Sequence, residues 1–299
     1  MAVSTRTLLE VVRLSTTFLA EHGSPSARLD AELLAAHALQ LRRIDLYLQF
    51  DRPLKDDELE SVREMVRRRG HGEPVAYITG VREFYGRDFA VSRDVLIPRP
   101  ETETLVQVAL DHIRAVADGR SILRVADLGT GSGCIAVTLA CELPDIKLTA
   151  TDVSGAALEV ARTNASRHGV SERITFVETS WADAVDGPID VVVSNPPYVT
   201  DDELAETERD VRGFEPETAL LGGEDGLHAY RALLESIGDR MNADSAVFVE
   251  VDPRRAEGVL ELMQAALPGS STALHADLTG RARVAACVKR RTLLAAAGG

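Results

Sequence analysis

Apolar residues recur every three or four positions through the first seventy residues of the chain. This spacing places them on one face of an α-helix. The pattern predicts one helix that ends at Gly23-Ser24-Pro25, a second over about 26–40 and a third over about 56–69. The third ends in Arg67-Arg68-Arg69-Gly70, where cations suit the negative end of the helix dipole. We therefore expect an N-terminal helical domain over residues 1–74.

The pattern changes between residues 75 and 100. Aromatic and β-branched residues occur there in runs separated by Gly80 and Gly86, which is typical of a β-hairpin. Ile97-Pro98-Arg99-Pro100 ends the segment, because proline cannot continue a strand ladder. We expect a β-hairpin linker over residues 75–100 and the start of the next domain at residue 101.

From residue 101 onward, short apolar runs alternate with helical patterns. This alternation predicts an α/β domain over residues 101–299, with a mostly parallel sheet covered on both faces. The expected strands lie at 122–128, 147–151, 174–177, 189–194, 245–251 and 282–288. The expected helices lie at about 133–142, 154–168, 228–240 and 254–266.

Composition narrows the class of protein. The chain has 299 residues, of which 45% are hydrophobic and 27% charged, as in folded globular proteins. No apolar run approaches the ~18 residues of a membrane span, and the first ten residues lack a signal-peptide core, so we expect a cytoplasmic protein without membrane contact. The net charge of −14 argues against a nucleic-acid partner, because such binding depends on neutralising phosphates. Three cysteines without a CxxC spacing and seven scattered histidines indicate neither a disulfide framework nor a metal site.

A glycine-rich loop follows the first strand of this domain. Gly129-Thr130-Gly131-Ser132-Gly133 allows a tight turn and a close approach by a cofactor, and Asp152 ends the next strand, where its carboxylate can bind ribose hydroxyls. The absence of a lysine after the loop excludes a P-loop. The third glycine comes one place too early for the dinucleotide fingerprint, which weakens NAD without excluding it. With Asp127 in front, the loop resembles the first motif of S-adenosylmethionine-dependent methyltransferases.

The most informative element is Ser194-Asn195-Pro196-Pro197-Tyr198, directly after the strand at 189–194. Consecutive prolines take the chain out of the sheet at its carboxyl edge, where open α/β sheets bind ligands. Asn195 offers an amide oxygen, Pro196 a backbone carbonyl and Tyr198 a flat ring. Two acceptors and a ring suit the methylation of a planar, poorly nucleophilic nitrogen. We predict that Asn195, Pro196 and Tyr198 are catalytic and that all four residues from Asn195 to Tyr198 bind the substrate.

Four segments carry a family resemblance. The segments at Gly72–Val106, Asp127–Ala140, Val192–Val199 and Phe214–Leu233 closely resemble bacterial release factor glutamine methyltransferases, the PrmC/HemK family. The resemblance covers essentially the whole chain. It implies an N-terminal helical domain that recognises the substrate, a hairpin linker and a Rossmann-like methyltransferase domain.

The resemblance also implies roles for particular residues. S-adenosyl-L-methionine, the methyl donor, would be bound by Gly129 to Gly133, by Asp152 and by Asn195, with Trp181 beside the adenine. The residues from Asn195 to Tyr198 would hold the glutamine of the Gly-Gly-Gln motif in peptide chain release factors, which is methylated at N5. No metal is implied.

Other functions stay open beside this one. A ribosomal-protein glutamine methyltransferase typically has a linker closer to Val-Pro-Arg-Ser, whereas this chain has Ile97-Pro98-Arg99-Pro100-Glu101. An amino-methyltransferase of DNA or ribosomal RNA is opposed by the net charge, and a cofactor-binding module without catalysis by the intact Asn195–Tyr198 element. The chain departs from the family at Ser180, where Asp is frequent, and at Glu250–Arg255, where Glu-Ile-Gly-x-x-Gln is usual. These departures concern the adenine contacts and the shape of a loop, not the chemistry at Asn195.

Overall fold

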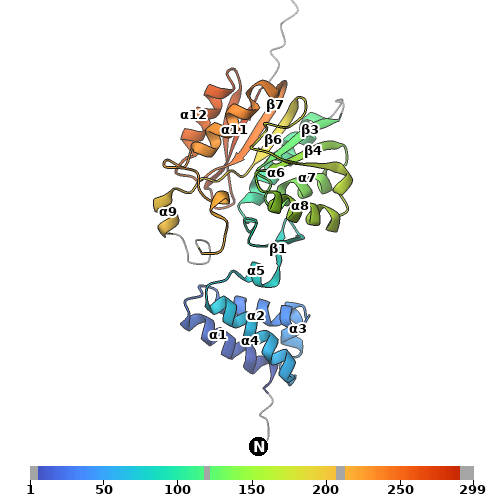
Figure 1. The fold of residues 1–299 in the computed structure, drawn as a ribbon, viewed down its shortest axis with the longest axis vertical. Helices are drawn as coiled ribbons and strands as arrows, with labels where there is room; N and C mark the ends of the chain where they lie inside the picture. The colour runs from blue at the N-terminus through green and yellow to red at the C-terminus, as the bar shows by residue number, and fades with distance from the viewer. Residues whose placement is uncertain (1–5, 118–121, 207–212, 290–299) are drawn as a thin grey trace, which may run out of the picture. The chain divides into compact units, whose positions relative to one another are not determined.

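The computed structural model describes residues 6–117, 122–206 and 213–289. Their residues form two units, with the main division between Val81 and Arg82 (Figure 1). The division falls inside the predicted 75–100 linker. The predicted domain boundaries at residues 74 and 100 stay predictions.

The first unit is helical, as the sequence predicts. Its helices are α1 (Leu8–Glu21), α2 (Ala27–Ala38), α3 (Arg43–Leu48), α4 (Asp56–Gly70) and α5 (Val75–Thr79). Thr7 begins α1 with a capping box, because its Oγ1 accepts from the backbone N–H of Glu10 while the Glu10 carboxylate accepts from the N–H of Thr7. Arg69 at the end of α4 forms a buried ion pair with Asp30 of α2, at 2.7 Å, which joins the two helices beside their shared apolar core.

The predicted hairpin is shorter than expected. Residues 75–79 form α5, which follows Pro74 and ends at Gly80 in the left-handed conformation that terminates helices. The hairpin consists of β1 (Val81–Phe84) and β2 (Arg87–Ala90). Tyr85 and Gly86 both have positive φ, at 51° and 69°, the combination that a tight two-residue hairpin turn requires.

A seven-stranded sheet forms the centre of the second unit. Its order is β5-β4-β3-β6-β7-β9-β8. Neighbours from β5 to β7 run parallel and β9 is antiparallel to both of its neighbours, which confirms the mostly parallel sheet. The strands are β3 (Leu123–Leu128), β4 (Ile146–Asp152), β5 (Ile174–Glu178), β6 (Ile189–Ser194), β7 (Met241–Glu250), β8 (Ser271–Ala276) and β9 (Ala282–Val288).

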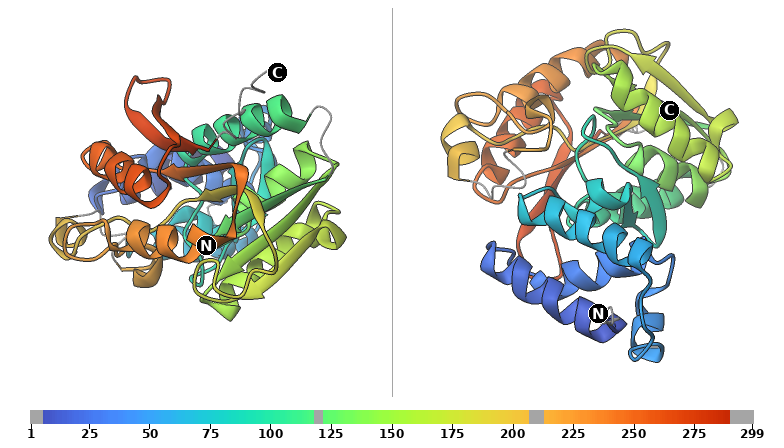
Figure 2. Two further views of the ribbon diagram at one scale, coloured as in Figure 1. Left: turned by 90° about the horizontal axis from the view of Figure 1, so that it is seen from above. Right: turned by 60° about the horizontal axis from the view of Figure 1, so that its bottom comes forward.

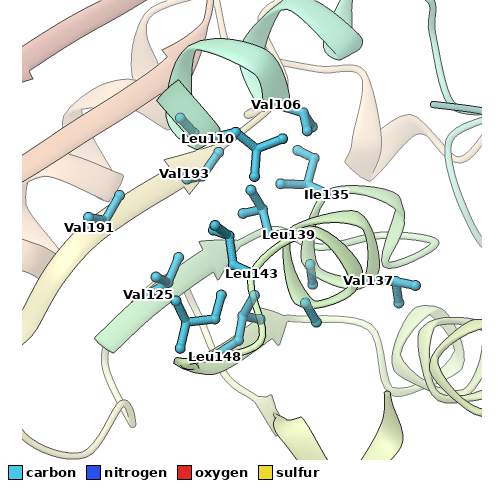
Figure 3. Packing of buried hydrophobic residues seen from close by; sticks show 14 of the residues in the cluster. Val106, Leu110, Val125, Ile135, Val137, Leu139, Leu143, Leu148, Val191 and Val193 are labelled. Atoms are coloured by element: carbon cyan, nitrogen blue, oxygen red, sulfur yellow. The ribbon is translucent and has the colours of Figure 1, made fainter. Parts of the chain in front are cut away.

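Helices cover both faces of this sheet, as predicted (Figures 1 and 2). The helices of the unit are α6 (Thr102–Ala117), α7 (Cys134–Glu142), α8 (Gly155–Arg167), α9 (Asp201–Glu206), α11 (His228–Ile237) and α12 (Ala256–Ala266), with short 3₁₀ turns at Ser171–Arg173, Glu217–Ala219 and Gly238–Arg240. On one face, side chains of α6 and α7 such as Leu110 and Leu139 pack against Val125 and Val193 of the sheet (Figure 3). On the other face, α11 and α12 pack over Val192.

The sequence prediction did not contain helices α3, α5, α6 and α9 or strand β8. Helix α6 contributes several fully buried side chains to the first face, yet its apolar stripe directly follows the proline-rich segment that was read as a linker. Strand β8 is an edge strand with a largely exposed side-chain pattern, so it lacks the apolar run by which the other strands were found.

The strand order determines where the predicted binding motifs lie in the second unit. From β3 the chain proceeds outward through β4 to β5, and it then returns to add β6 and β7 on the other side of β3. The order therefore reverses between β3 and β6, and open α/β sheets bind ligands at the carboxyl ends of such strands. The loop Gly129–Gly133 follows β3 and Asn195 follows β6, so the two predicted motifs leave the sheet from adjacent strands.

Candidate active site

A pocket lies at this point of the second unit. It is lined by the predicted residues Gly129–Ser132, Asp152, Trp181, Asn195 and Pro197. The other lining residues are Asp94, Val95, Leu96, Pro98, Arg99, Thr102, Cys134, Ile135, Val153, Ser154, Ala157, Thr179, Pro216, Thr218 and Ala219. Motifs more than sixty positions apart in the sequence thus share one cavity. Gly133, Pro196 and Tyr198 do not line it: Pro196 is buried, and Tyr198 is half-buried and packs on the α11–α12 side of the sheet.

The glycine loop needs its glycines for two different reasons. Gly129, Gly131 and Gly133 all have positive φ, between 55° and 77°, which other residues adopt only with strain. A Cβ on Gly133 would lie 3.0 Å from the Cβ of Ala161 in α8, so this glycine also permits close helix packing. A Cβ on Gly131 would meet no described atom within 4 Å, which leaves open space on the pocket side of the loop.

Asp127, at the end of β3, holds this loop from inside the protein. Its Oδ2 accepts hydrogen bonds from Thr130 Oγ1 at 2.6 Å and from the backbone N–H of Ala136 at 3.0 Å. Its Oδ1 has no hydrogen-bond partner among the residues that the structure describes. Complete burial raises the pKa of Asp127 to about 7, because the charged form loses its hydration.

Asp152 connects the end of β4 to the same loop. Its Oδ2 accepts from the backbone N–H of Gly131 at 2.9 Å, and its Oδ1 accepts from the N–H of Ser154 at 2.9 Å. Burial raises the pKa of Asp152 above its ordinary value. Each oxygen of a carboxylate can accept more than one hydrogen bond, so both remain able to accept from a ligand in the pocket.

Trp181 has two environments, because it lines the pocket and also packs against the apolar cluster of α11 and α12. One of its ring carbons lies 3.6 Å from the position of a Cβ on Gly129. Its φ of +43° is rare for a bulky residue and costs about 1 kcal/mol or more, the kind of local strain that collects at functional sites.

Asn195 belongs to a chain of hydrogen bonds that the sequence did not predict. Its Nδ2 donates to Thr102 Oγ1 at 3.3 Å, and Thr102 Oγ1 donates to Glu250 Oε2 at 2.6 Å. Thr102 begins α6 and Glu250 ends β7, and each is only 2% exposed. Burial raises the pKa of Glu250 to about 7. The sequence carries only a weak signal for this chain, because Thr102 lies just after the predicted 75–100 linker and Glu250 lies in a segment that departs from the family pattern.

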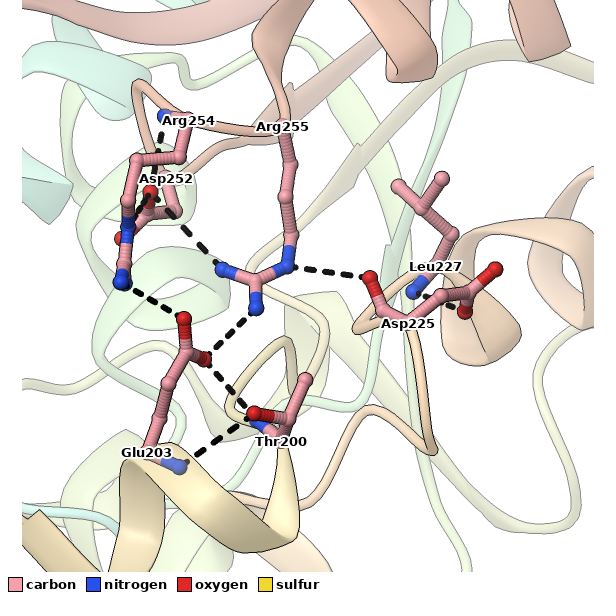
Figure 4. Close-up of polar contacts among 7 residues, drawn as sticks. All are labelled: Thr200, Glu203, Asp225, Leu227, Asp252, Arg254 and Arg255. Atoms are coloured by element: carbon pink, nitrogen blue, oxygen red, sulfur yellow. Dashed lines mark hydrogen bonds and ion pairs between the residues drawn. The ribbon is translucent and has the colours of Figure 1, made fainter.

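Three residues of the atypical segment Glu250–Arg255, namely Asp252, Arg254 and Arg255, form a charged cluster (Figure 4). Arg254 and Arg255 both contact Glu203 of α9, at 2.6 Å each, and Arg254 also pairs with Asp252 at 2.8 Å. Arg255 Nε donates to the main-chain oxygen of Asp225 at 3.2 Å. The departure from the family pattern therefore ties the loop after β7 to the chain that follows Tyr198.

Two searches of the described ranges bear on other kinds of site. Within residues 6–117, 122–206 and 213–289, His, Cys, Asp and Glu side chains form no group of three or more that could hold a metal ion. None of the helices in those ranges is both long and apolar enough to cross a membrane.

Comparison with known protein families agrees with this architecture. The family model described as PrmC N-terminal domain matches residues 10–80, and the model described as Methyltransferase small domain matches residues 106–210. The crystal structure of a methyltransferase from Pyrococcus furiosus superimposes with a TM-score of 0.50 at 19% identity, over 77% of this chain and 99% of that one, and thus shares the fold. The fold and the site define an S-adenosyl-L-methionine-dependent methyltransferase.

Curated relatives identify the family more narrowly. A release factor glutamine methyltransferase of Chlorobaculum tepidum is 44% identical over 275 residues, which are 89% of this chain and 90% of that protein. A release factor glutamine methyltransferase of Rhodopirellula baltica is 40% identical over 282 residues, which are 93% of this chain and 95% of that protein. The chain belongs to the release factor glutamine methyltransferase family, as its motifs predicted.

Proposed function

We propose that this enzyme transfers a methyl group from S-adenosyl-L-methionine to the side-chain nitrogen N5 of the glutamine in the Gly-Gly-Gln motif of bacterial peptide chain release factors. The observation that carries the proposal is that the Asn195 amide and the glycine loop line one pocket at the carboxyl ends of β3 and β6. The family relationship supports the choice of substrate.

The residues on the β3–β4 side of the pocket fit the methyl donor. The open side of Gly131 admits a ligand to the backbone of the loop Gly129–Gly133, and the carboxylate of Asp152 can accept from ribose hydroxyls. Trp181 offers a flat apolar wall for the adenine. When bound, S-adenosyl-L-methionine supplies an electrophilic methyl group on a cationic sulfur.

The residues after β6 fit a primary amide. Asn195 Oδ1 would accept one N–H of the glutamine side chain, and Pro197 would contact the flat group in the pocket. The Pro196 carbonyl and the ring of Tyr198 do not line the pocket, so they would have to come into contact with the glutamine when it binds. An amide nitrogen is a poor nucleophile, because its lone pair is delocalised into the carbonyl. Two acceptors fix its orientation and increase its electron density, so positioning supplies much of the catalysis. The proton leaves the nitrogen after the methyl group has arrived.

The thiol nearest to this chemistry does not take part in our mechanism. Cys134 lines the pocket, yet burial raises its pKa to about 12, so it stays a protonated thiol at neutral pH. Catalysis through Asn195 and Pro196 requires no strong base.

We assign recognition of the release factor to the N-terminal helical unit. Large apolar side chains on this unit are exposed, among them Ile44, Leu48 and Phe50 at 56%, 71% and 52%. Such side chains are typical of surfaces that contact another protein. Replacing Leu48 with Ser should raise KM for the release factor and leave the affinity for S-adenosyl-L-methionine unchanged. A release factor as substrate supports our proposal that the enzyme works in the cytoplasm.

The test is transfer of labelled methyl from S-adenosyl-L-methionine to a purified bacterial release factor, beside the same factor with its Gly-Gly-Gln glutamine changed to Ala. We expect label on the intact factor alone. Label on both factors would show that another residue is methylated. Label on neither, with ribosomal protein or nucleic acid labelled in parallel reactions, would overturn the proposed substrate.

A further inference from the structure

Thr102 and Glu250 form a buried chain of polar groups that ends at Asn195, and this chain has no part in the mechanism above. We propose that Thr102 and Glu250 are positioning residues that hold the Asn195 amide with its oxygen, and not its nitrogen, toward the substrate. The inference rests on the proposed function, because it concerns how Asn195 accepts from the glutamine amide. It adds two residues from α6 and β7 to the substrate half of the site.

The donors and acceptors of the three side chains fix the orientation of the amide. An ionised carboxylate can only accept hydrogen bonds, so the 2.6 Å contact between Glu250 Oε2 and Thr102 Oγ1 uses the single proton of the hydroxyl. Thr102 Oγ1 can then only accept from its other neighbour. The atom of Asn195 that faces it, at 3.3 Å, must therefore be the donor Nδ2. Since the amide is planar, Oδ1 is left for the pocket that Asn195 lines.

Glu250, at the buried end of this chain, is itself held by a hydrogen bond. Tyr230 of α11 donates from its hydroxyl to the main-chain oxygen of Glu250 at 2.9 Å, and both residues are almost completely buried. Thr102 is held by the start of α6, where its backbone N–H donates to the oxygen of Arg99. Glu250 does not line the pocket and Thr102, which does, is only 2% exposed, so the hydrogen-bonded chain extends from the interior to the pocket.

Protonation of Glu250 would allow the hydrogen bonds between Glu250, Thr102 and Asn195 to run in the opposite direction. A neutral carboxyl can donate to Thr102 Oγ1, and Thr102 can then donate to Asn195 Oδ1. The amide would turn over and present its N–H groups to the N–H groups of the substrate. The pKa of Glu250 is raised to about 7 by burial, so this reversal would fall within the range in which the enzyme can be assayed. Methyl transfer should therefore decrease as the pH falls below about 7.

Other charged or titratable groups act on Glu250 from every element around it. Arg99 and Arg283 lower its pKa, and Glu101 raises it. The remaining neighbours are the phenols of Tyr198 and Tyr230 and the thiol of Cys134, whose own pKa values are raised and which are uncharged near neutral pH. Within this group of residues, burial raises the pKa of Glu250 to about 7.

The first test compares Thr102→Val with Thr102→Ser. Valine has the shape of threonine but neither donates nor accepts, whereas serine keeps the hydroxyl. We expect Thr102→Val to lower kcat by about 10- to 100-fold, since Asn195 loses its only described orienting partner. KM for the release factor should change little, because one amide is a small part of a protein–protein contact. Thr102→Ser should restore kcat to within about threefold of the wild type.

The second test uses Glu250→Gln, which can donate or accept and so no longer dictates the direction of the chain. In the wild type, kcat should rise with pH and level off above about pH 7. In Glu250→Gln it should be low and independent of pH over the same range. An independent reading comes from the side-chain NH₂ resonances of Asn195 in ¹⁵N-labelled protein, identified by their loss in Asn195→Ala. They should shift with pH in the wild type and stay constant in Glu250→Gln.

The outcomes separate this inference from the proposed function. A wild-type enzyme that labels no release factor would contradict the function. A wild-type enzyme that labels the factor, with Thr102→Val equally active, would contradict the positioning role alone. An equal loss of kcat in Thr102→Val and Thr102→Ser would also contradict the positioning role, because the hydroxyl would then not matter. If Thr102→Val does not fold, a pH profile of Glu250→Gln identical to that of the wild type decides against the inference.

Discussion

Asp127 and Glu250 are both buried carboxyl groups at the ends of strands, and each accepts from a threonine hydroxyl at 2.6 Å. What lies beyond the threonine differs. Asp127 also accepts from the backbone N–H of Ala136, a donor that cannot reverse, and it holds a loop of main chain. Glu250 acts through a hydroxyl and a side-chain amide, both of which can reverse.

The difference corresponds to the roles that we propose for the two halves of the pocket. The donor half, which we propose binds S-adenosyl-L-methionine, is the loop Gly129–Gly133 with Asp152; it is formed largely by backbone, and Asp127 and Asp152 hold the loop. The substrate half, which we propose binds the glutamine, depends on the orientation of the Asn195 amide. Backbone groups keep their hydrogen-bonding direction when a neighbouring carboxyl is protonated, whereas an amide held through a hydroxyl can reverse.

The largest expected effect is at Asn195. Asn195→Ala removes an acceptor from the substrate half and leaves the donor half intact, so methyl transfer should fall by about 100-fold or more. Its affinity for S-adenosyl-L-methionine, measured by calorimetry, should stay within about threefold of the wild type. A fully active variant would remove Asn195 from the mechanism.

The pH dependence of stability distinguishes Asp127 from an exposed carboxyl. Its pKa is 3.8 in a free side chain and about 7 when folded, so the folded protein holds this proton more tightly and loses stability as the pH rises from about 4 to 7. Relative to Asp127→Asn, the wild type should lose about 2–3 kcal/mol of unfolding free energy between pH 5 and pH 8, measured by urea denaturation.

Asp225 provides the control for that measurement. It is exposed, and its hydrogen bond from Arg231 and that from the N–H of Leu227 lower its pKa to about 2. A lowered pKa contributes stability that is lost only as the pH falls below about 4. Asp225→Asn and the wild type should therefore show the same change between pH 5 and pH 8. A wild-type protein that follows Asp127→Asn over this range would show that Asp127 is not the titrating group.

A smaller effect is expected from the geometry of the glycine loop. Gly133→Ala combines a positive φ with a Cβ placed 3.0 Å from Ala161, whereas Gly169→Ala has a similar φ of 71° and open space around the Cβ. Both should lower stability by about 1 kcal/mol. Only Gly133→Ala should also weaken cofactor binding, by about 10-fold, because the loop has to shift. Equal cofactor affinity in the two variants would contradict this role of the loop.

The smallest effect concerns the charged cluster behind the substrate half. Arg255 is 10% exposed and Arg254 is 65% exposed, although both contact Glu203. Arg255→Met should lower the free energy of unfolding by about 1–2 kcal/mol, and Arg254→Met by less than about 1 kcal/mol. Thermal denaturation of both variants checks the order, and equal melting temperatures would contradict it.

The two halves also differ in how far the sequence predicts them. The residues of the donor half could be predicted from local sequence. The spacing of the glycines indicates a tight loop, and the acidic residue at the end of the next strand indicates a group that can bind ribose. Asn195 was predicted for the same reason. Thr102 and Glu250 were not, since they stand 93 positions before and 55 positions after Asn195 and meet it only through the strand order. The strained φ of Trp181 likewise has no signature in its residue type.

The most direct test of the division between the two halves measures cofactor affinity and saturated kcat in Asp127→Asn and Glu250→Gln side by side, with a release factor as substrate at pH 8. Asp127→Asn should weaken the binding of S-adenosyl-L-methionine by about 10-fold and largely keep kcat when the donor is saturating. Glu250→Gln should bind the donor normally and lose kcat by about 10-fold. Loss of cofactor affinity in both variants, with kcat unchanged in both, would contradict the account.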